Sequence, residues 1–457
     1  MLREGYVCDA WDCPSPSAYQ LQIFEFRQGR ALKIFATLSP QVRLNLWVLF
    51  SAGLLFWSAL AAMLPILPLY VEDIGVDSIT IGVVMGSFAI GLLSSRSWLA
   101  YLADHRGRKL VMVIGMAVVA IAPLCYLLTQ SVPLLIVIRA FHGLSIAAFA
   151  LAYSALVVDL SPPHQRGELI GYMSLVNPVG MALGPAIGGF LHEWAGYTPA
   201  FVAAAALGFV GLGCTLRVQE ARSPNHSTVT TLQSSSPDGA IARPRPQFWS
   251  LLSTSPIRIP AIVLLLIGLA FGTLSTFVPL FVHEAGVTLN VGLFYTAAAI
   301  ASFGIRLLVG RASDQRGRGP FITLSLILYT FAMTLLWLAT SAPLFLLAAM
   351  FEGAGAGILI PMMAALMADR SHPNERGRNF SLCMAGFDLG IAIAGPIFGA
   401  IAVQTNYRTT FGLCAGLAFI GLLVFITLSS KDLAHSLRFA LGRGHDVYAV
   451  EKLRFNA

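Results

Sequence analysis

Apolar residues recur along this chain in runs of about 20, and short polar stretches separate the runs. A run of that length forms a helix that crosses the hydrocarbon core of a bilayer, which is about 30 Å thick. The pattern predicts an all-α membrane protein with twelve transmembrane helices. Their approximate positions are 44–71, 79–103, 110–128, 133–158, 168–191, 198–216, 259–282, 290–310, 320–339, 343–368, 379–403 and 409–430.

A polar segment divides the runs into two sets of six. It is rich in Ser, Pro and Arg, a composition typical of flexible linkers. We therefore predict an N-terminal six-helix bundle, a linker and a C-terminal six-helix bundle, with a tail at each end. The ranges are 1–43 (tail), 44–217 (bundle), 218–257 (linker), 258–430 (bundle) and 431–457 (tail).

Composition supports a membrane protein over a soluble one. Of the 457 residues 56% are hydrophobic and only 11% are charged, which is too few polar residues to cover a soluble globule of this size. The net charge of +7 does not indicate nucleic-acid binding, because the basic residues lie in short loops between apolar runs and not on one face. Membrane lipid is the expected surrounding.

The distribution of basic residues predicts the orientation. Of the 29 Lys and Arg residues, 25 lie on one side of the predicted membrane; the exceptions are Arg96, Arg139 and Arg306 inside runs and Arg408 on the other side. Loops with an excess of Lys and Arg face the cytoplasm. We therefore expect a multi-pass protein of the cell (inner) membrane, with both termini and the linker in the cytoplasm.

The two halves repeat one another. Arg96, Asp104 and Arg108 in the first half recur 210 residues later as Arg306, Asp314 and Arg318. Other positions match at a spacing of 210 or 211: Pro68 with Pro279, His142-Gly143 with Glu352-Gly353, Asp159 with Asp369, and Gly184-Pro185 with Gly395-Pro396. Two bundles of the same orientation, related by an axis along the membrane normal, are an architecture of transporters.

The loop between the second and third runs resembles a signature of the major facilitator superfamily, Gly-x-Leu-Ala-Asp-x-x-Gly-Arg-Lys. Residues 100–109 match it except that Ala100 replaces the first Gly, and the resemblance extends over about 44–430. It implies that Asp104 and Asp314 dock on the other bundle, at the starts of the eleventh and fifth helices. The implied cytoplasmic gate comprises Asp104, Gly107, Arg108, Lys109, Asp314, Gly317, Arg318, Asp159 and Asp369.

The fifth run carries a second pattern, Gly180-x-x-x-Gly184-Pro185-x-x-Gly188-Gly189. It resembles the motif associated in this superfamily with proton-coupled antiporters, which are exporters. Small residues at this spacing also allow two helices to approach closely, so tight helix packing alone is the other interpretation.

Charged groups inside predicted membrane helices each need a reason, because their insertion is costly. Asp388 lies near the membrane midplane, and in the superfamily fold the helix that carries Arg96 packs against the helix that carries Asp388. We predict an Arg96–Asp388 pair, with Arg306 near Asn177 at the equivalent place of the repeat. An Arg neighbour favours the charged form of a carboxyl group, so the pair serves either proton coupling or structure alone.

Arg139 and Glu352 complete the predicted proton-coupling group with Asp388 and Arg96. Arg139 matches the superfamily's basic residue four positions before a glycine, Gly143, and Glu352 matches His142 by the repeat. We expect His142 to be satisfied by a neighbouring group. The charged residues at the opposite helix ends, Glu72, Asp73, His283 and Glu284, are expected to be solvated.

The first, fourth, seventh and tenth helices line the central cavity in this superfamily. Here they carry six aromatic residues, Phe56, Trp57, Phe149, Tyr153, Phe271 and Phe277. An aromatic, sparsely polar cavity suits amphipathic or hydrophobic compounds. Packing between helices or against lipid is the alternative for each residue.

We therefore predict a secondary active transporter that exports small amphipathic or hydrophobic compounds by alternating access, in exchange for protons. Import of a small solute by a facilitator or symporter is the alternative. An enzyme, a metal site and a cofactor are not expected, because the nine His are scattered without an HExxH pairing. No GxxxxGK[ST] loop for ATP occurs either. We expect a monomer.

Overall fold

The computed structural model describes residues 38–162, 165–220, 255–372 and 375–450, and this part of the chain contains helices and no strand. Twelve spans in it are long and apolar enough to cross a membrane, as the sequence predicted. The helices are α2 (Pro40–Ala62), α3 (Leu67–Asp73), α4 (Ser78–Arg106), α5 (Arg108–Leu127), α6 (Val132–Leu160), α7 (Arg166–Met173), α8 (Val176–Ala195), α9 (Tyr197–Arg217), α11 (Ser255–Glu284), α12 (Val291–Arg316), α13 (Gly319–Leu338), α14 (Ala342–Asp369), α15 (Arg376–Gln404), α16 (Tyr407–Leu428) and α17 (Leu433–Ala440).

Two spans of the first half are each made of two helices. The first breaks between α2 and α3, where Pro65 and Pro68 have no N–H to donate to the preceding turn. The fifth breaks between α7 and α8, where Pro178 cannot donate to the carbonyl group of Ser174. Their equivalents in the second half, α11 and α15, run unbroken.

Glycine makes the turns that join α4 to α5 and α12 to α13. Gly107 has φ of 101° and Gly317 has φ of 82°, a region that side chains rarely adopt. Both turns therefore depend on glycine, as the repeated loop motif indicated.

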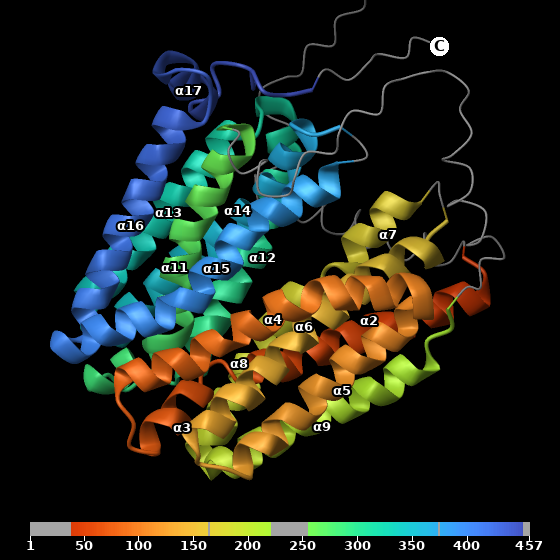
Figure 1. The fold of residues 1–457 in the computed structure, drawn as a ribbon, viewed down its shortest axis with the longest axis vertical. Coiled ribbons are helices and arrows are strands. Elements are labelled where there is room, and N and C mark those ends of the chain that lie inside the picture. The colour runs from red at the N-terminus through yellow and green to blue at the C-terminus, as the bar shows by residue number, and fades with distance from the viewer. Residues whose placement is uncertain (1–37, 163–164, 221–254, 373–374, 451–457) are drawn as a thin grey trace, which may run out of the picture.

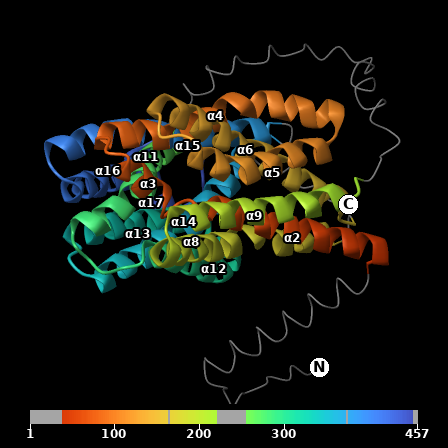
Figure 2. The ribbon, with the colours of Figure 1, turned by 90° about the horizontal axis from the view of Figure 1, so that it is seen from below.

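The helices form two bundles, α2–α9 and α11–α16, which meet mainly through two pairs of helices, α4 with α15 and α8 with α12 (Figures 1 and 2). Smaller contacts of α11 with α3 and α4 add to this interface. We call the end that carries the Gly107 and Gly317 turns the basic end, and the end that carries the α3–α4 turn the short-loop end. The bundles converge toward the short-loop end and diverge toward α7 and α17 at the basic end (Figure 1).

Glycines allow the bundles to approach closely. A Cβ atom on Gly82 of α4 would meet the carbonyl oxygen of Gly395 in α15, and the reverse holds for a Cβ atom on Gly395. One helical turn further along α4, a Cβ atom on Gly86 would lie 2.5 Å from the carbonyl oxygen of Ala392. The backbones of α4 and α15 are therefore in direct contact.

The glycines of the fifth span serve two contacts. Gly180, Gly184 and Gly188 lie against Trp57, Ser58 and Ala62 of α2, within the same bundle. Gly189 instead faces Gly292 of α12 across the bundle interface, and Gly292 in turn faces the carbonyl group of Pro185. The pattern thus packs α8 on two sides, and its association with antiport stays a prediction.

The C-terminal residues, predicted as a tail, fold against the second bundle. The backbone of Phe439 in α17 lies against Gly319 of α13, and Thr323 donates to the carbonyl group of Ala440 at 3.0 Å. The buried Arg370 binds both carboxylate oxygens of Asp446, at 2.7 and 3.1 Å. The predicted N-terminal tail and linker lie almost wholly outside the described residues.

Candidate coupling site between the two bundles

An ion pair joins the bundles near the middle of the membrane span. A guanidinium nitrogen of Arg96 in α4 lies 3.0 Å from Oδ2 of Asp388 in α15. The Asp388 side chain is 9% exposed, whereas that of Arg96 is 37% exposed. The predicted pairing is therefore confirmed. Oδ2 receives no well-aligned hydrogen bond from the described residues, so the contact is an ion pair.

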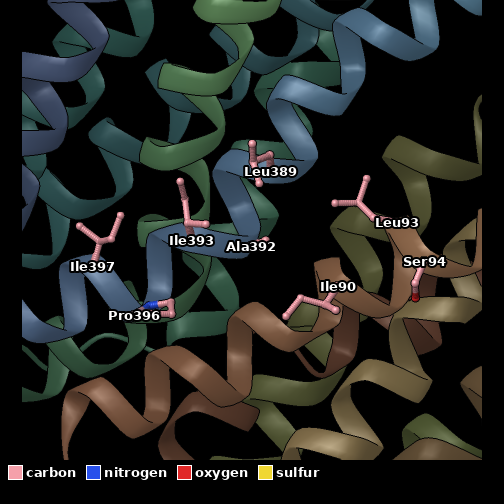
Figure 3. Close-up of a pocket in the computed structure, with 8 residues that line it drawn as sticks. All are labelled: Ile90, Leu93, Ser94, Leu389, Ala392, Ile393, Pro396 and Ile397. Atoms are coloured by element: carbon pink, nitrogen blue, oxygen red, sulfur yellow. The ribbon is translucent and has the colours of Figure 1, made fainter. Parts of the chain in front are cut away.

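An apolar groove of about 620 Å³ lies beside this pair, between the same two helices. Ile90 and Leu93 of α4 face Leu389, Ile393 and Ile397 of α15 across it (Figure 3). Ser94 is the one polar side chain in its lining. Leu389 of this lining directly follows Asp388 in the chain, whereas neither member of the ion pair lines the groove itself.

The equivalent place in the repeat does not carry an ion pair. Arg306 lies on α12 and Asn177 on α8, and these two helices pack together as expected. Both side chains are partly buried, and Nε of Arg306 has no hydrogen-bond partner among the described residues. At this position of the repeat, the contact of α4 with α15 thus has the carboxylate of Asp388, whereas the contact of α8 with α12 has the amide of Asn177.

A second group of polar side chains lies inside the first bundle. The guanidinium group of Arg139 lies over the ring of Phe88, 4.6 Å from its centroid. His142 is fully buried, and its Nδ1 atom lies 3.3 Å from the Tyr126 hydroxyl group. The prediction that a neighbouring group satisfies His142 is met at Nδ1, whereas Nε2 has no described partner. Sequence reasoning missed Tyr126, because a single Tyr in an apolar run carries no pattern.

Glu352 occupies the matching position in the second bundle. It is 4% exposed, and its carboxyl group interacts with the hydroxyl group of Tyr329. Its Oε1 atom has no hydrogen-bond partner among the described residues. Glu352 lies on α14 and Asp388 on α15, and no hydrogen bond or ion pair joins them in the described part of the chain. The second bundle thus holds one carboxyl group in its interior and another at its interface with the first bundle.

The six predicted cavity aromatics divide into two kinds. Phe56 and Phe149 are fully buried and stack with ring centroids 3.9 Å apart, and Phe277 stacks on Tyr407 at 5.5 Å. Tyr153 is 7% exposed and donates to the carbonyl group of Met173. These four pack within helices in this conformation and are closed to a ligand. Trp57 and Phe271 are partly exposed, and each also packs against another ring, Phe56 and Phe387 respectively.

The predicted gate residues at the basic end pair within their own bundles. Arg108 binds Asp159, and Arg318 binds Asp369 at 3.3 Å. Lys109 donates to the carbonyl group of Leu216 at 2.7 Å. These contacts fix each loop to its own bundle.

The predicted docking of Asp104 on the start of α15 is absent from this conformation. Asp104 is exposed and makes no ion pair with a described residue, because the bundles are apart at the basic end. The side chain of Asp314 lies outside the described residues.

At the short-loop end, by contrast, side chains join the two bundles. Ser78 and Tyr407 share a hydrogen bond of 2.9 Å, and His283 lies 3.6 Å from Glu72. Of the helix-end residues expected to be solvated, Asp73, His283 and Glu284 are exposed, and Glu72 is partly buried. Glu72 also pairs with His283 across the interface, and Asp73 also accepts a hydrogen bond from Tyr197 at 2.6 Å. A cavity of about 510 Å³ lies between these groups.

Comparisons with known proteins agree with this architecture. Solved structures of the nucleoside transporter NupG and of a POT family transporter in complex with a thioalcohol-conjugated peptide have the same fold. Their TM-scores are 0.65 and 0.68, each at 15% identity over 83% of this chain, and they are covered to 99% and 95%.

Two curated relatives are bacterial resistance proteins. Multidrug resistance protein MdtG of Salmonella choleraesuis (strain SC-B67) is 26% identical over 384 residues, which cover 81% of this chain and 92% of MdtG. Quinolone resistance protein NorA of Staphylococcus aureus (strain MRSA252) is 28% identical over 261 residues, which cover 57% of this chain and 63% of NorA. The chain thus matches less than two thirds of the length of NorA.

The family model described as Major Facilitator Superfamily matches residues 49–328 and 291–445, which together extend over nearly the whole helical part of the chain. The repeated loop motif, the twelve spans and the two bundles are all accounted for by this match. The chain belongs to the Major Facilitator Superfamily and is a multi-pass membrane protein.

Proposed function

We propose that this transporter exports small amphipathic or hydrophobic compounds in exchange for protons, by alternating access of a central site to the two sides of the membrane. The observation that carries the proposal is the Arg96–Asp388 pair. It joins α4 to α15, two of the helices through which the two bundles meet. Similarity to MdtG and NorA supports export over import.

The proposed orientation places the basic end in the cytoplasm, where loops rich in Lys and Arg are retained. In that orientation the bundles are closed on the outer side, through Ser78–Tyr407 and Glu72–His283, and apart on the inner side. The described conformation is then open to the cytoplasm. We therefore expect a substrate to enter from the cytoplasm.

In this proposal, proton exchange at Asp388 drives the movement of the bundles by changing its attraction to Arg96. While the carboxyl group is ionised, attraction to Arg96 holds α4 and α15 together around the crossing. A proton on Asp388 removes that attraction, and the bundles become free to rearrange. Because a charged group inside the membrane is costly unless paired, loss of the pair and movement of the bundles are coupled.

The proposed substrate class follows from the surfaces near this pair. The groove between α4 and α15 is lined by five apolar residues, a proline, an alanine and one serine. The partly exposed aromatic rings, Trp57 and Phe271, add flat apolar contacts. Apolar pockets with few polar groups suit amphipathic or hydrophobic molecules and not heavily hydroxylated ones.

Transport direction tests this proposal against import. The full chain is reconstituted in vesicles with a known orientation, and movement of a cationic dye is followed under an imposed pH gradient. We expect the dye to move against the direction of proton flow. Movement of solute together with protons, or movement that ignores the gradient, would replace the proposal with a symporter or a facilitator. A matched resistance assay compares cells that express the wild-type chain with cells that express the Asp388→Asn variant.

A further inference from the structure

Helix α17 has three distinct faces. Ser436, Phe439 and Ala440 are buried against the second bundle. Leu433, Leu437 and Leu441 are 56%, 38% and 58% exposed, and their spacing of four residues places them along one stripe. Arg438 and His435, which are also exposed, lie on the side of the stripe away from the bundle.

The start of α17 is fixed directly after the last membrane span. The helix begins at Leu433, five residues after α16 ends at Leu428. A carboxylate oxygen of Asp432 accepts the backbone N–H of His435 at 2.8 Å, which caps the helix and lowers the pKa of that carboxyl group. The Ser436 hydroxyl oxygen accepts the backbone N–H of Ser430 at 2.9 Å. These contacts hold the helix at the level where the span leaves the hydrocarbon.

Neighbouring helices place α17 at the periphery of the molecule. It packs on α16 and α13 and not over the space between the bundles. Both neighbours present exposed apolar residues to lipid near the same end, such as Leu428 of α16 and Leu324 of α13. The leucine stripe of α17 therefore continues a surface that already faces lipid.

The charge around the stripe is mainly positive. Lys431, Arg438 and Arg443 are exposed, whereas Asp446 is neutralised by Arg370. Asp432 is the one exposed acidic residue in the described segment after α16. A helix with an apolar stripe beside cationic residues lies in the interfacial plane of a bilayer and attracts anionic headgroups.

We propose that α17 is an interfacial anchor, which inserts Leu433, Leu437 and Leu441 at the boundary of the acyl chains and binds anionic phospholipid headgroups through Lys431, Arg438 and Arg443. Through its contacts with α13 and α16, the anchor holds the second bundle at a fixed depth in the membrane. This role is independent of which solute the protein carries and of the direction of transport.

Depth-dependent quenching tests the insertion. Single cysteines replace Leu437 or, as the matched control on the polar side of the same helix, His435, in full-length chain whose native cysteines are replaced. Each carries a fluorophore and is reconstituted in phosphatidylcholine vesicles that contain lipid spin-labelled near the glycerol end of its acyl chain. We expect strong quenching at position 437 and weak quenching at 435. Equal quenching at both positions, or stronger quenching of position 437 by aqueous iodide, would overturn the proposal.

Lipid selection tests the charge. The quencher is placed either on phosphatidylglycerol or on phosphatidylcholine in mixed vesicles, and quenching at position 437 is compared. We expect phosphatidylglycerol to be favoured, and the Arg438→Gln and Arg443→Gln substitutions each to reduce that preference about fivefold. No preference in the unsubstituted chain would contradict the headgroup site. Disulfide formation between two chains at position 437 would show that a second copy, and not lipid, covers the stripe.

Discussion

At the scale of single residues, the central feature is an ion pair whose two members belong to different bundles. The Arg96 side chain is more exposed than that of Asp388, 37% against 9%. A pair of this kind is sensitive to the protonation of one group, because an uncharged carboxyl group no longer attracts the guanidinium group. In the described conformation, the pair stabilises the contact between α4 and α15.

The Asp388→Asn substitution tests the role of the carboxyl group. The amide has almost the same volume but cannot ionise, so we expect folding to be retained and proton-driven transport to be lost. Loss of the partner of Arg96 should lower the stability of the fold by about 1–2 kcal/mol, less than for a fully buried pair because Arg96 is partly exposed. Transport driven by a pH gradient and unfolding in detergent are measured on the same preparation.

The control is Asn177→Asp, which places a carboxyl group at the equivalent position of the repeat in α8. Full proton coupling in the Asp388→Asn variant would reduce the Arg96–Asp388 pair to a structural contact. Coupling lost in Asp388→Asn and restored in the double variant would show that either bridge between the bundles supports the proton step.

At the scale of helices, the contact between α4 and α15 depends on the absence of side chains. We expect Gly82→Ala to force the two backbones apart, because a Cβ atom there meets the carbonyl group of Gly395. Overpacking of this kind typically costs about 1–3 kcal/mol. Ile66 is fully buried at the short-loop end. In a chain without native cysteines, we expect a cysteine introduced by Ile66→Cys to be modified faster when Gly82→Ala separates the helices.

Gly416→Ala is the matched control for that substitution. Gly416 lies within α16, and a Cβ atom there has nothing within 4 Å. We expect this change to be neutral or to stabilise the helix by up to about 1 kcal/mol. Equal effects of both substitutions would argue against a specific glycine contact between the bundles.

The C-terminal segment is held by one arginine. Arg370 binds Asp446 and also donates to the carbonyl groups of Pro256 and Ser429, at 3.0 and 2.9 Å. We expect Arg370→Ala to destabilise the second bundle by about 3–5 kcal/mol, because it removes the charged partner of the largely buried Asp446 carboxylate and a donor to two carbonyl groups. The Tyr448 backbone N–H still donates to that carboxylate at 3.1 Å. Asp446→Asn should cost less, and the exposed Arg438→Ala should change stability by under about 0.5 kcal/mol.

Apparent melting temperature and protease resistance of the segment after residue 428 measure these three variants. An Arg370→Ala chain as stable as the Arg438→Ala chain would show that the contacts of Arg370 contribute nothing to the stability of the fold.

At the scale of the whole molecule, the sequence carried most of the architecture. Runs of apolar residues predicted all twelve spans, and the repeat of 210 residues predicted two bundles and the helix pair that contains Arg96 and Asp388. These features follow from regular patterns, which one sequence shows directly. The exposure of Trp57 and the burial of Phe56, one residue apart, depend on helix rotation within the bundle, which an almost uniformly apolar run does not reveal.

The sequence was least informative where contacts cross the fold. The ion pair of Arg370 with Asp446 joins residues 76 positions apart and has no local sequence pattern. Pairing of Glu72 with His283 appears only when the two bundles close at the short-loop end. The gate pairs Arg108–Asp159 and Arg318–Asp369 each join residues 51 positions apart within one bundle, and no local pattern marks them.

The claim that the bundles alternate around the Arg96–Asp388 pair is tested most directly by the distance between them at the basic end. Spin labels at Arg106→Cys in α4 and Ser381→Cys in α15, in chain without native cysteines, report that distance by pulsed paramagnetic resonance. We predict two distance populations, with the shorter one increasing at low pH and dominating in the Asp388→Asn variant. A single distance that neither pH nor this substitution changes would contradict the account.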